Sequence, residues 1–337
     1  MKAMVLREHG GSEKMQLEAD FPDPVAGEGD VVLRVKASSL NYHDVFTRRG
    51  MPGINLPFPV IMGLDIAGEI IEVGPGVEGW AVGDRVLVDP SNKIEGGLMG
   101  ETVHGGLAEK CRTRAHQLIR IPDGVSYEQA AALPVAYGTA HRMMKTIGQV
   151  QAGEKVLILG ASGGVGVCCV QLAKLAGAEV FACAGSPEKG ERLKALGADH
   201  IILYTETDFM KAVHEMTGKP GRNRLQKSGG VDVVVNFTGG DTWVKSLRSL
   251  RLGGRLLTCG ATAGFDPKED LRYVWSFELQ IRGSNGWDRE DLHALLELVD
   301  SGKLKAPIDK EWPLEEAAAA LDTIEQRKVF GKVVVVS

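Results

Sequence analysis

The sequence predicts an α/β protein in which a doubly wound parallel sheet is combined with a second, partly barrel-like β region. A glycine-rich stretch at 154–178 separates an apolar run from an amphipathic run. Strand-like and helix-like segments then alternate as far as residue 259, whereas the first 127 residues hold short strand-like runs broken by Gly and Pro. At 337 residues, the chain is long enough for two domains, each with its own core.

The stretch 154–178 contains a strand, a tight turn and a helix in the order of a dinucleotide-binding turn. Residues 156–159 suit a strand buried on both faces, and apolar residues recur at helical spacing over 167–175. Glycine permits positive φ and lets backbone N–H groups approach a pyrophosphate. A glycine turn alone often marks only a tight turn, so the prediction depends on the segments that follow. The glycines of the turn are Gly160, Gly163, Gly164 and Gly166.

The segments after the turn alternate between strand and helix at the length of β-α units. This repetition predicts a parallel, doubly wound sheet and favours cofactor binding over a plain turn. We expect strands at 179–184, 200–204, 231–236, 255–259 and 279–284, and helices at 187–196, at 241–250 and between the strands at 200–204 and 231–236.

The two ends of the chain show a different pattern. The first part predicts an antiparallel, partly barrel-like region with little helix, followed by a helical stretch at 127–147. The last strand-like run, 333–336, is expected to return to this region, which gives one domain of 1–127 with 287–337 and another of 128–286. The other expected strands are 2–7, 30–37, 66–73 and 85–89, and the other expected helices are 289–301 and 314–326.

Composition excludes several classes of function. Hydrophobic residues make up 44% and charged residues 25% of the chain, as in ordinary globular proteins. A net charge of −5 argues against nucleic acid or an anionic membrane as the main partner. No signal-peptide core or membrane-length apolar run is present, and the five cysteines lack CxxC spacing. These features predict a cytoplasmic protein with free thiols.

Six short segments, in this order, resemble the medium-chain dehydrogenase/reductase superfamily over essentially the full chain. The resemblance implies a GroES-like catalytic domain and a Rossmann nucleotide-binding domain. Within the superfamily, the chain is most similar to the zinc-free quinone oxidoreductase branch. The segments are LNYHD at 40–44, VGPGV at 73–77, VGDRV at 82–86, GASGGVG at 160–166, LGAD at 196–199 and GKVV at 331–334.

The resemblance also bears on zinc. Zinc-dependent relatives have a cysteine where this chain has Asn41 and a His-Glu pair where it has Leu64-Asp65. An amide and an alkyl group cannot replace thiolate and imidazole as zinc ligands. Residues 89–110 also lack the cysteines of the structural zinc site. The remaining candidates, His43, His104 and His116, share no ligand-like spacing. We therefore expect no metal.

The second strand of the parallel sheet ends without the carboxylate that binds the ribose of NAD. Its absence favours NADPH, because an acid would repel the 2′-phosphate. Ser186 and Lys189 could bind that phosphate, and Tyr204 matches a tyrosine of quinone oxidoreductases that lines the same pocket. In the alternative interpretation, Ser186 caps the next helix and Lys189 is a solvated charge. Both interpretations can hold together.

The resemblance implies further contacts with the cofactor. Most of these residues follow the carboxyl ends of strands, where open α/β sheets bind ligands. They include amides for the pyrophosphate, a threonine beside the nicotinamide and a lysine near its ribose. The pyrophosphate amides are those of Ser162, Gly163, Gly164 and Val165, the threonine is Thr139 and the lysine is Lys332. The residues after later strands are Phe237 and Thr238, Gly260 and Ala261, and Ser284 and Asn285.

The expected reaction is hydride transfer from NADPH to a quinone or to the C=C bond of an α,β-unsaturated carbonyl. Such an electron-poor small molecule delocalises the added charge without a metal. Asn41 could bind the carbonyl or the ribose, and Asp44 is expected to orient its neighbours. Tyr42, His43, Tyr137 and solvent all remain possible proton donors.

Three alternatives stay open: an acryloyl- or crotonyl-type enoyl-CoA reductase, a metal-dependent alcohol dehydrogenase, and a non-catalytic NADPH-binding protein. The basic stretch 217–230 is either a surface loop or a positive flap over the adenosine phosphate or an acyl-CoA. The expected oligomer is a homodimer formed through the edge of the parallel sheet, with apolar material at 259–265 and 271–281.

Overall fold

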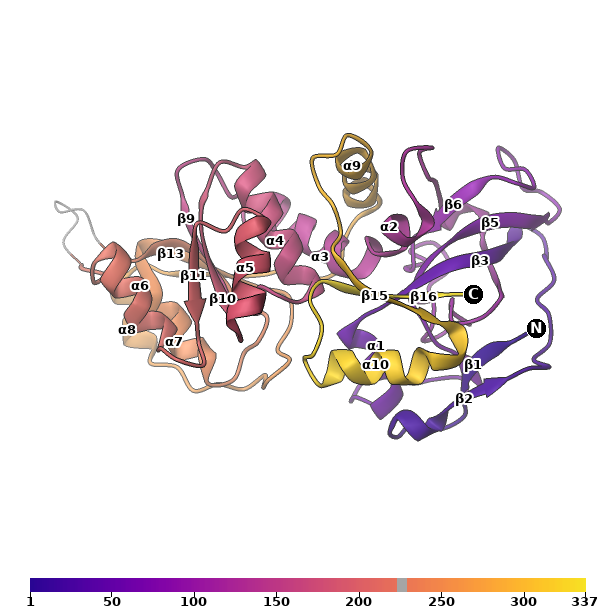
Figure 1. The fold of residues 1–337 in the computed structure, drawn as a ribbon, viewed down its shortest axis with the longest axis horizontal. Helices are drawn as coiled ribbons and strands as arrows, with labels where there is room; N and C mark the ends of the chain where they lie inside the picture. The colour runs from indigo at the N-terminus through magenta and orange to yellow at the C-terminus, as the bar shows by residue number, and fades with distance from the viewer. Residues whose placement is uncertain (223–228) are drawn as a thin grey trace. The chain divides into compact units, whose positions relative to one another are not determined.

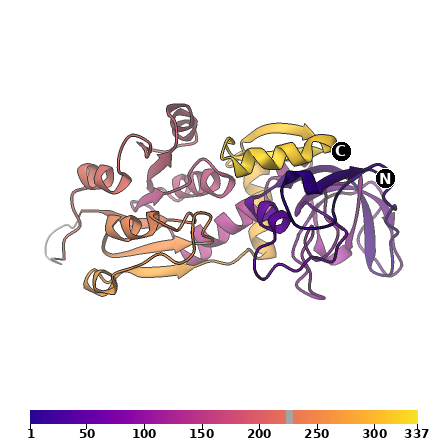
Figure 2. The same cartoon turned by 90° about the horizontal axis from the view of Figure 1, so that it is seen from below.

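The computed structural model describes residues 1–222 and 229–337, and the chain divides into two compact units. The β-rich unit comprises Met1–Tyr137 and Arg289–Ser337, and the parallel-sheet unit comprises Gly138–Asp288 (Figures 1 and 2). The first division therefore falls at Tyr137, inside the helical stretch expected at 127–147, rather than at residue 127.

The β-rich unit contains two sheets in the described part of the chain. One has the order β15-β16-β3-β5-β6-β8, with β7 also paired to β3, and the other has the order β2-β1-β4. The strands are β1 (Ala3–Leu6), β2 (Met15–Glu18), β3 (Asp30–Leu40), β4 (Val60–Ile61), β5 (Asp65–Val73), β6 (Arg85–Val88), β7 (Lys110–Arg114), β8 (Leu118–Arg120), β15 (Ile308–Pro313) and β16 (Lys332–Val336).

Strand β3 is the centre of the larger sheet because it pairs with three neighbours. Its residues Val31, Leu33 and Val35 pack in a buried cluster with Ile66 and Ile70 of β5. Its other end pairs antiparallel with β16, so that Leu40 lies opposite Val333. The last strand therefore returns to the first region of the chain, as the sequence predicts.

Helix is more abundant in the β-rich unit than the sequence suggests. Helix α1 (Tyr42–Arg49) begins with a reciprocal capping box between Asn41 and Asp44. The buried guanidinium of Arg48 connects α1 to the acidic side of α10 (Ala317–Glu325). The others are α2 (Tyr127–Ala131), a π-helical turn at Pro134–Gly138, α9 (Arg289–Asp300) and short 3₁₀ turns at Ser12–Lys14, Ala115–Gln117 and Leu314–Glu316.

The parallel-sheet unit has the order β11-β10-β9-β12-β13-β14, with every neighbouring pair parallel. The order reverses beside β9, and in a doubly wound sheet such a switch point leaves a ligand-binding crevice at the carboxyl ends. The α/β fold class predicted from the sequence is thus confirmed. The strands are β9 (Lys155–Ile158), β10 (Glu179–Ala184), β11 (His200–Leu203), β12 (Val231–Val235), β13 (Leu250–Thr258) and β14 (Gln280–Gly283).

The helices of this unit connect successive parallel strands. Strand β13 begins at Leu250, where the sequence predicts the end of a helix. None of the helices in the described ranges is both long and apolar enough to span a bilayer. The helices are α3 (Thr139–His141), a π-helical turn at Arg142–Ile147, α4 (Gly164–Leu175), α5 (Pro187–Ala195), α6 (Phe209–Thr217), α7 (Thr242–Ser249) and α8 (Leu271–Ser276).

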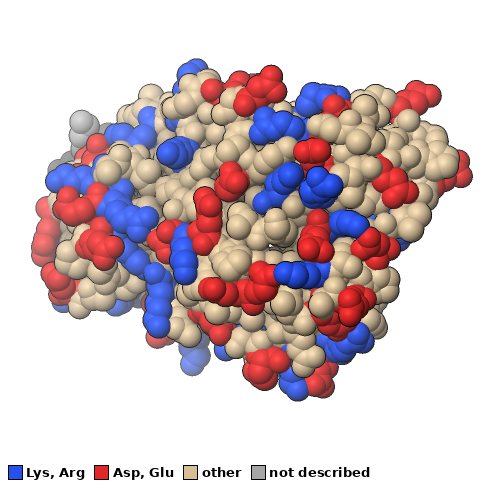
Figure 3. Space-filling model, turned by 45° about the vertical axis from the view of Figure 1, so that its right-hand side comes forward, with Lys and Arg blue, Asp and Glu red and all other residues tan. Residues whose placement is uncertain are grey.

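Charges of both signs are interspersed on the face shown in Figure 3. The expected basic loop at 217–230 includes residues 223–228, which lie outside the described residues. Its described ends lead into the amino end of β12, at the edge of the sheet opposite the carboxyl ends.

Candidate functional site

The glycine-rich turn has the geometry of a close backbone passage. Gly160 has φ of +62°, and a Cβ added to Gly166 would lie 2.3 Å from the Gly160 carbonyl oxygen. The Gly163 N–H closes the turn onto that same carbonyl at 3.1 Å. Helix α4 then begins at Gly164, so the amides of Gly164 and Val165 lie in the first helical turn, where they have no partner within the helix. An anion fits this position best.

The loops after β12, β13 and β14 meet at the same edge of the sheet. A Cβ at Gly160 would lie 2.9 Å from the ring of Phe237, so the first turn and the loop after β12 are in contact. The Thr262 N–H donates to the Phe237 carbonyl at 3.2 Å, and the Ala263 N–H donates to Thr238 at 2.7 Å. The predicted cofactor residues Gly260 and Ala261 lie between these contacts and the end of β13.

The hydroxyl of Ser284, just after β14, is buried and has no hydrogen-bond partner among the described residues. Its backbone N–H donates to Thr258 O at 2.8 Å, which holds Ser284 and its neighbour Asn285 beside β13. A buried hydroxyl without a partner is costly, so a ligand at this edge would satisfy it.

Asn236 shapes the loop after β12 and was not singled out from the sequence. Its side-chain oxygen accepts from the Thr238 and Gly239 amides at 2.9 and 3.0 Å, and its Nδ2 donates to Thr242 and Ser246. An asparagine at a strand end is a signal for such a turn.

At the end of β10, Ser186 caps α5 by accepting the Lys189 N–H at 3.3 Å. The capping interpretation is therefore confirmed, and the Ser186 hydroxyl hydrogen stays available to a ligand. A Cβ at Gly185 would lie 2.6 Å from the Tyr204 hydroxyl, so this hydroxyl lies close to the backbone after β10. Ser186, Lys189 and Tyr204 thus follow neighbouring strand ends at the carboxyl edge.

In the β-rich unit, three side chains from three strand ends form a buried cluster. Lys332 Nζ donates to Asn41 Oδ1 at 2.6 Å, to Asp65 Oδ2 at 3.3 Å and to the Leu40 carbonyl at 3.1 Å. Asn41 Nδ2 donates to Asp65 Oδ2 at 2.9 Å and to the Ser39 carbonyl at 3.3 Å. All three ammonium donors and both amide donors are therefore engaged inside the protein.

Electrostatics in this Asn41–Asp65–Lys332 cluster are set by burial. Asp65 is fully buried, and burial raises its pKa despite the nearby ammonium of Lys332. Burial likewise lowers the pKa of Lys332, with Asp65 opposing the change. The other oxygen of Asp65 accepts the Val135 N–H at 2.9 Å. This bond holds the π-helical turn that carries the fully buried Tyr137 next to the cluster.

Asp44 lies beside this cluster on α1. Its Oδ2 accepts the Asn41 N–H at 2.7 Å, and its Oδ1 is buried without a partner among the described residues. Burial raises the pKa of Asp44 to about 7, against the partly compensating effects of the Asn41 amide, His43 and Lys332. Asp44 is therefore partly protonated near neutrality, whereas an ordinary exposed carboxylate would be ionised.

Thr139 is nearly buried at the first residue of α3 and belongs to the parallel-sheet unit with the other predicted nucleotide contacts. Lys332, by contrast, belongs to the β-rich unit together with Asn41, Asp44 and Tyr137. Asp65 and Glu101, which contacts His43, were missed as site residues. Asp65 had a signal, an acidic residue within an apolar strand, whereas Glu101 lies in a loop whose path the sequence does not indicate.

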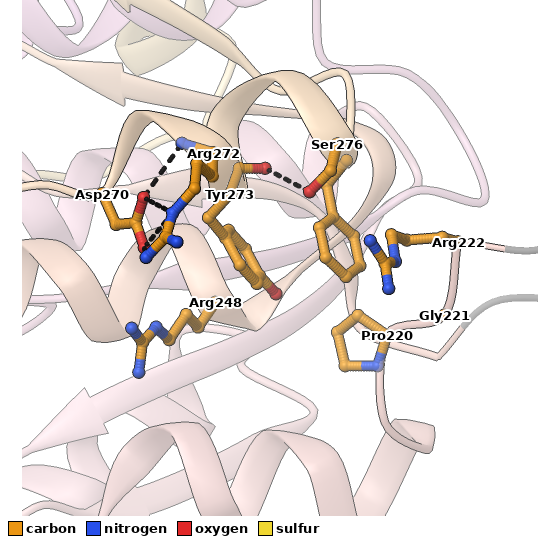
Figure 4. Close-up of a pocket in the computed structure, with 9 residues that line it drawn as sticks. Pro220, Gly221, Arg222, Arg248, Asp270, Arg272, Tyr273 and Ser276 are labelled. Atoms are coloured by element: carbon orange, nitrogen blue, oxygen red, sulfur yellow. Dashed lines mark hydrogen bonds and ion pairs between the residues drawn. The ribbon is translucent and has the colours of Figure 1, made fainter.

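The parallel-sheet unit also has an open pocket of about 480 Å³ at the amino edge of its sheet (Figure 4). Arg272 is held by Asp270 at 2.8 Å there, and the Arg248 guanidinium lies 5.9 Å from the Tyr273 ring centre. The loop end at Arg222 borders it. Because the predicted cofactor contacts follow the carboxyl ends of the strands, the described ends of the basic loop do not cover them.

Comparisons with known proteins give a consistent family. Residues 27–123 match the model described as alcohol dehydrogenase GroES-like domain, and residues 164–301 match that described as zinc-binding dehydrogenase. The acryloyl-coenzyme A reductase of Sulfurisphaera tokodaii is 31% identical, with 99% of each chain covered.

Solved structures agree. The crystal structure of an NAD-dependent alcohol dehydrogenase has a TM-score of 0.92 and 37% identity, with all of both chains covered. A mycobacterial quinone oxidoreductase has a TM-score of 0.80 and 27% identity, also with all of both chains covered.

The residues present do not fit the zinc that one family description implies. Asn41 offers an amide already bonded to Lys332 and Asp65, and Leu64 is a buried alkyl group. A cation would also have to share Asp65 with an ammonium at 3.3 Å. Within the described ranges, no group of three or more His, Cys, Asp or Glu side chains could hold a metal ion.

Proposed function

Because the chain belongs to the medium-chain dehydrogenase/reductase superfamily, whose members use NAD(P)H, we propose that it is an NADPH-dependent oxidoreductase that reduces a quinone or the C=C bond of an α,β-unsaturated carbonyl without zinc. The observation that carries this proposal is the buried Asn41–Asp65–Lys332 cluster. Its ammonium already neutralises the carboxylate that a metal would need. Alcohol oxidation without a Lewis acid lacks the group that stabilises an alkoxide.

The choice of NADPH is supported by the end of β10, where no carboxylate follows the strand. The Ser186 hydroxyl and the Tyr204 hydroxyl are the donors that the proposal assigns to the 2′-phosphate. The similar structure named as an NAD-dependent enzyme keeps NADH as the competing cofactor, so the two must be compared directly.

When bound, the cofactor supplies the hydride, and the residues of the chain bind and orient. The Gly164 and Val165 amides hold the pyrophosphate, and Ser284 donates its unsatisfied hydroxyl. Asn41 and Lys332 have no donor left for a ligand, so we assign them the role of fixing the ends of β3, β5 and β16. Thr139 is assigned to the nicotinamide.

An enoyl thioester is the second candidate substrate, and the name of the Sulfurisphaera tokodaii relative favours it. It requires the same hydride acceptor, a C=C bond conjugated to a carbonyl. A free enone, a quinone and an enoyl-CoA therefore differ in binding rather than in the reduction step.

We also propose a homodimer formed through β14, the outer strand of the sheet in the described part of the chain. Leu271 and Trp275 nearby are 68% and 65% exposed, and Ile281 on the strand is 47% exposed. An exposed apolar edge strand is a template for pairing with a second copy. Sedimentation should show a dimer for the native chain and a monomer for Ile281→Lys combined with Trp275→Glu.

We also propose a cytoplasmic location. The five free cysteines of the chain agree with a reducing compartment.

The decisive experiment follows the oxidation of NADPH against a 1,2-quinone, a 1,4-quinone, an alkenal, a cyclic enone and crotonyl-CoA. NADH and a chelator-treated sample run in parallel. Turnover with NADPH that a chelator leaves unchanged supports the proposal and identifies the acceptor. NADPH binding without any turnover would favour the non-catalytic alternative, and loss of turnover with chelator would favour the metal-dependent one.

A further inference from the structure

His43, at the second residue of α1, forms a short contact with a carboxylate from a distant loop. Its Nε2 lies 2.7 Å from Glu101 Oε2, and the side chains are 35% and 14% exposed. The contact fixes the ring, because a histidine held through one nitrogen presents the other in a defined direction. No hydrogen bond of His43 Nδ1 occurs among the described residues.

A histidine–glutamate pair occurs twice more among the described residues, so this geometry alone does not make a site. His116 lies 2.8 Å from Glu95, and His200 lies 2.8 Å from Glu179. What distinguishes His43 is its position two residues after Asn41 and next to Asp44, beside the buried polar cluster. His116 follows β7, and His200 is the first residue of β11. Neither lies beside the Asn41–Asp65–Lys332 cluster.

The other candidate proton donors lack a route to solvent or a free orientation. Asp44 and Tyr137 are both fully buried, so neither can exchange a proton directly with water. The Tyr42 ring packs edge-on against Phe46, one turn along its own helix, with the ring centres 5.1 Å apart. His43 combines partial exposure with a charged partner.

We propose that His43 is the proton donor of the reduction and that Glu101 orients it and keeps it charged. This inference rests on the proposed function. After hydride adds to the β-carbon, the imidazolium transfers its Nδ1 proton to the enolate and becomes neutral. Solvent then reprotonates the exposed ring, so each turnover consumes one hydride from NADPH and one proton from solvent.

The charges around His43 agree with this role. Glu101 faces its Nε2 from the loop, and Asp44 follows it on α1. Both carboxylates favour the imidazolium, and together they raise the pKa of His43 although burial acts in the opposite direction. Asp65 and Lys332 act in turn on Asp44: the charge of Asp65 raises the pKa of Asp44 and the charge of Lys332 lowers it. A larger fraction of His43 is therefore protonated at neutral pH than for a free histidine.

The test compares His43→Gln and Glu101→Gln with His116→Gln, a matched control that breaks the equivalent pair with Glu95. The acceptor is the one identified by the NADPH assay, and kcat is measured across pH. We expect the native kcat to fall as pH rises through the pKa of His43. His43→Gln should lower kcat by roughly 100-fold and remove that limb, because general acids contribute about that factor or more. Its KM for NADPH should change little.

Glu101→Gln should shift the limb to lower pH, since it removes the charge that favours the imidazolium, and His116→Gln should leave the profile unchanged. Thermal unfolding of each variant separates lost catalysis from lost fold. If the native protein turns over and folded His43→Gln keeps the same fall of kcat with rising pH, the proton-donor proposal is overturned while the proposed function stands. No native turnover with any acceptor would remove the proposed function and the proton donor with it.

Discussion

Lys332 Nζ lies 2.6 Å from Asn41 Oδ1, and both residues are nearly inaccessible to solvent. The two are far apart in sequence but meet because β16 pairs with the end of β3. A buried ammonium is tolerated only with compensating oxygens, and here three of them surround it. This contact therefore adds a side-chain link to the pairing that joins the last strand of the β-rich unit to the end of β3.

Replacing Lys332 by Met should destabilise the protein strongly. The change leaves Asp65 as a buried carboxylate without its cation, a loss that typically costs roughly 3–5 kcal/mol. Urea unfolding of the full chain measures this loss of stability. The double change Lys332→Met with Asp65→Asn should recover part of the loss because it removes the uncompensated charge. The exposed Lys303→Met is the control, and an equal effect there would contradict the prediction.

Asp44→Asn should make stability less dependent on pH. The folded pKa of about 7 lies above the ordinary value of 3.8 for an aspartate, so the folded state binds the proton more tightly than the unfolded state. Stability from this group is present below about pH 4 and is lost as pH rises through about 7. The loss is at most about 4 kcal/mol, from 1.36 kcal/mol per unit. Between about pH 5 and about pH 8, the free energy of unfolding should fall less steeply with pH for Asp44→Asn than for the native protein. Equal slopes of unfolding free energy against pH for the native protein and Asp44→Asn would contradict this prediction.

The parallel sheet could be predicted from the sequence because its signals are local. The glycines between 156–159 and 167–175 indicate the turn, and each later strand is a short apolar run followed by a helix. Strand β10 has the bounds that the pattern predicts, 179–184. Strand β13 differs because residues 250–254 continue into a strand whose pairing with β12 is irregular.

The buried cluster could be predicted only in part because its contacts are not local. Asn41 and Asp44 stand in one motif, but Asp65 joins them through the pairing of β5 with β3. The contact of Lys332 with Asn41 depends on the return of β16. Helix α1 was not predicted, and it begins at a capping box formed by Asn41 and Asp44, two residues of the same motif.

Gly166→Ala should weaken both folding and nucleotide binding, whereas Gly163→Ala should leave the fold intact. The added Cβ at Gly166 would lie 2.3 Å from a backbone oxygen that cannot move independently. At Gly163 its nearest neighbour would lie at 3.6 Å, an ordinary contact, and the backbone there is extended. We expect a drop of several degrees in Tm for Gly166→Ala and at least roughly tenfold weaker NADPH binding. Equal Tm values for the two variants would contradict this reading of the turn.

Gly185→Ala should reduce the preference for NADPH over NADH. A methyl group there would lie 2.6 Å from the Tyr204 hydroxyl and would displace it from the end of β10. Since the proposal assigns that hydroxyl to the 2′-phosphate, KM for NADPH should rise by roughly tenfold while KM for NADH stays similar. Tyr204→Phe isolates the hydroxyl without crowding and should shift the preference in the same direction. If both variants kept the native ratio of kcat/KM for the two cofactors, Tyr204 would have no part in recognising the phosphate.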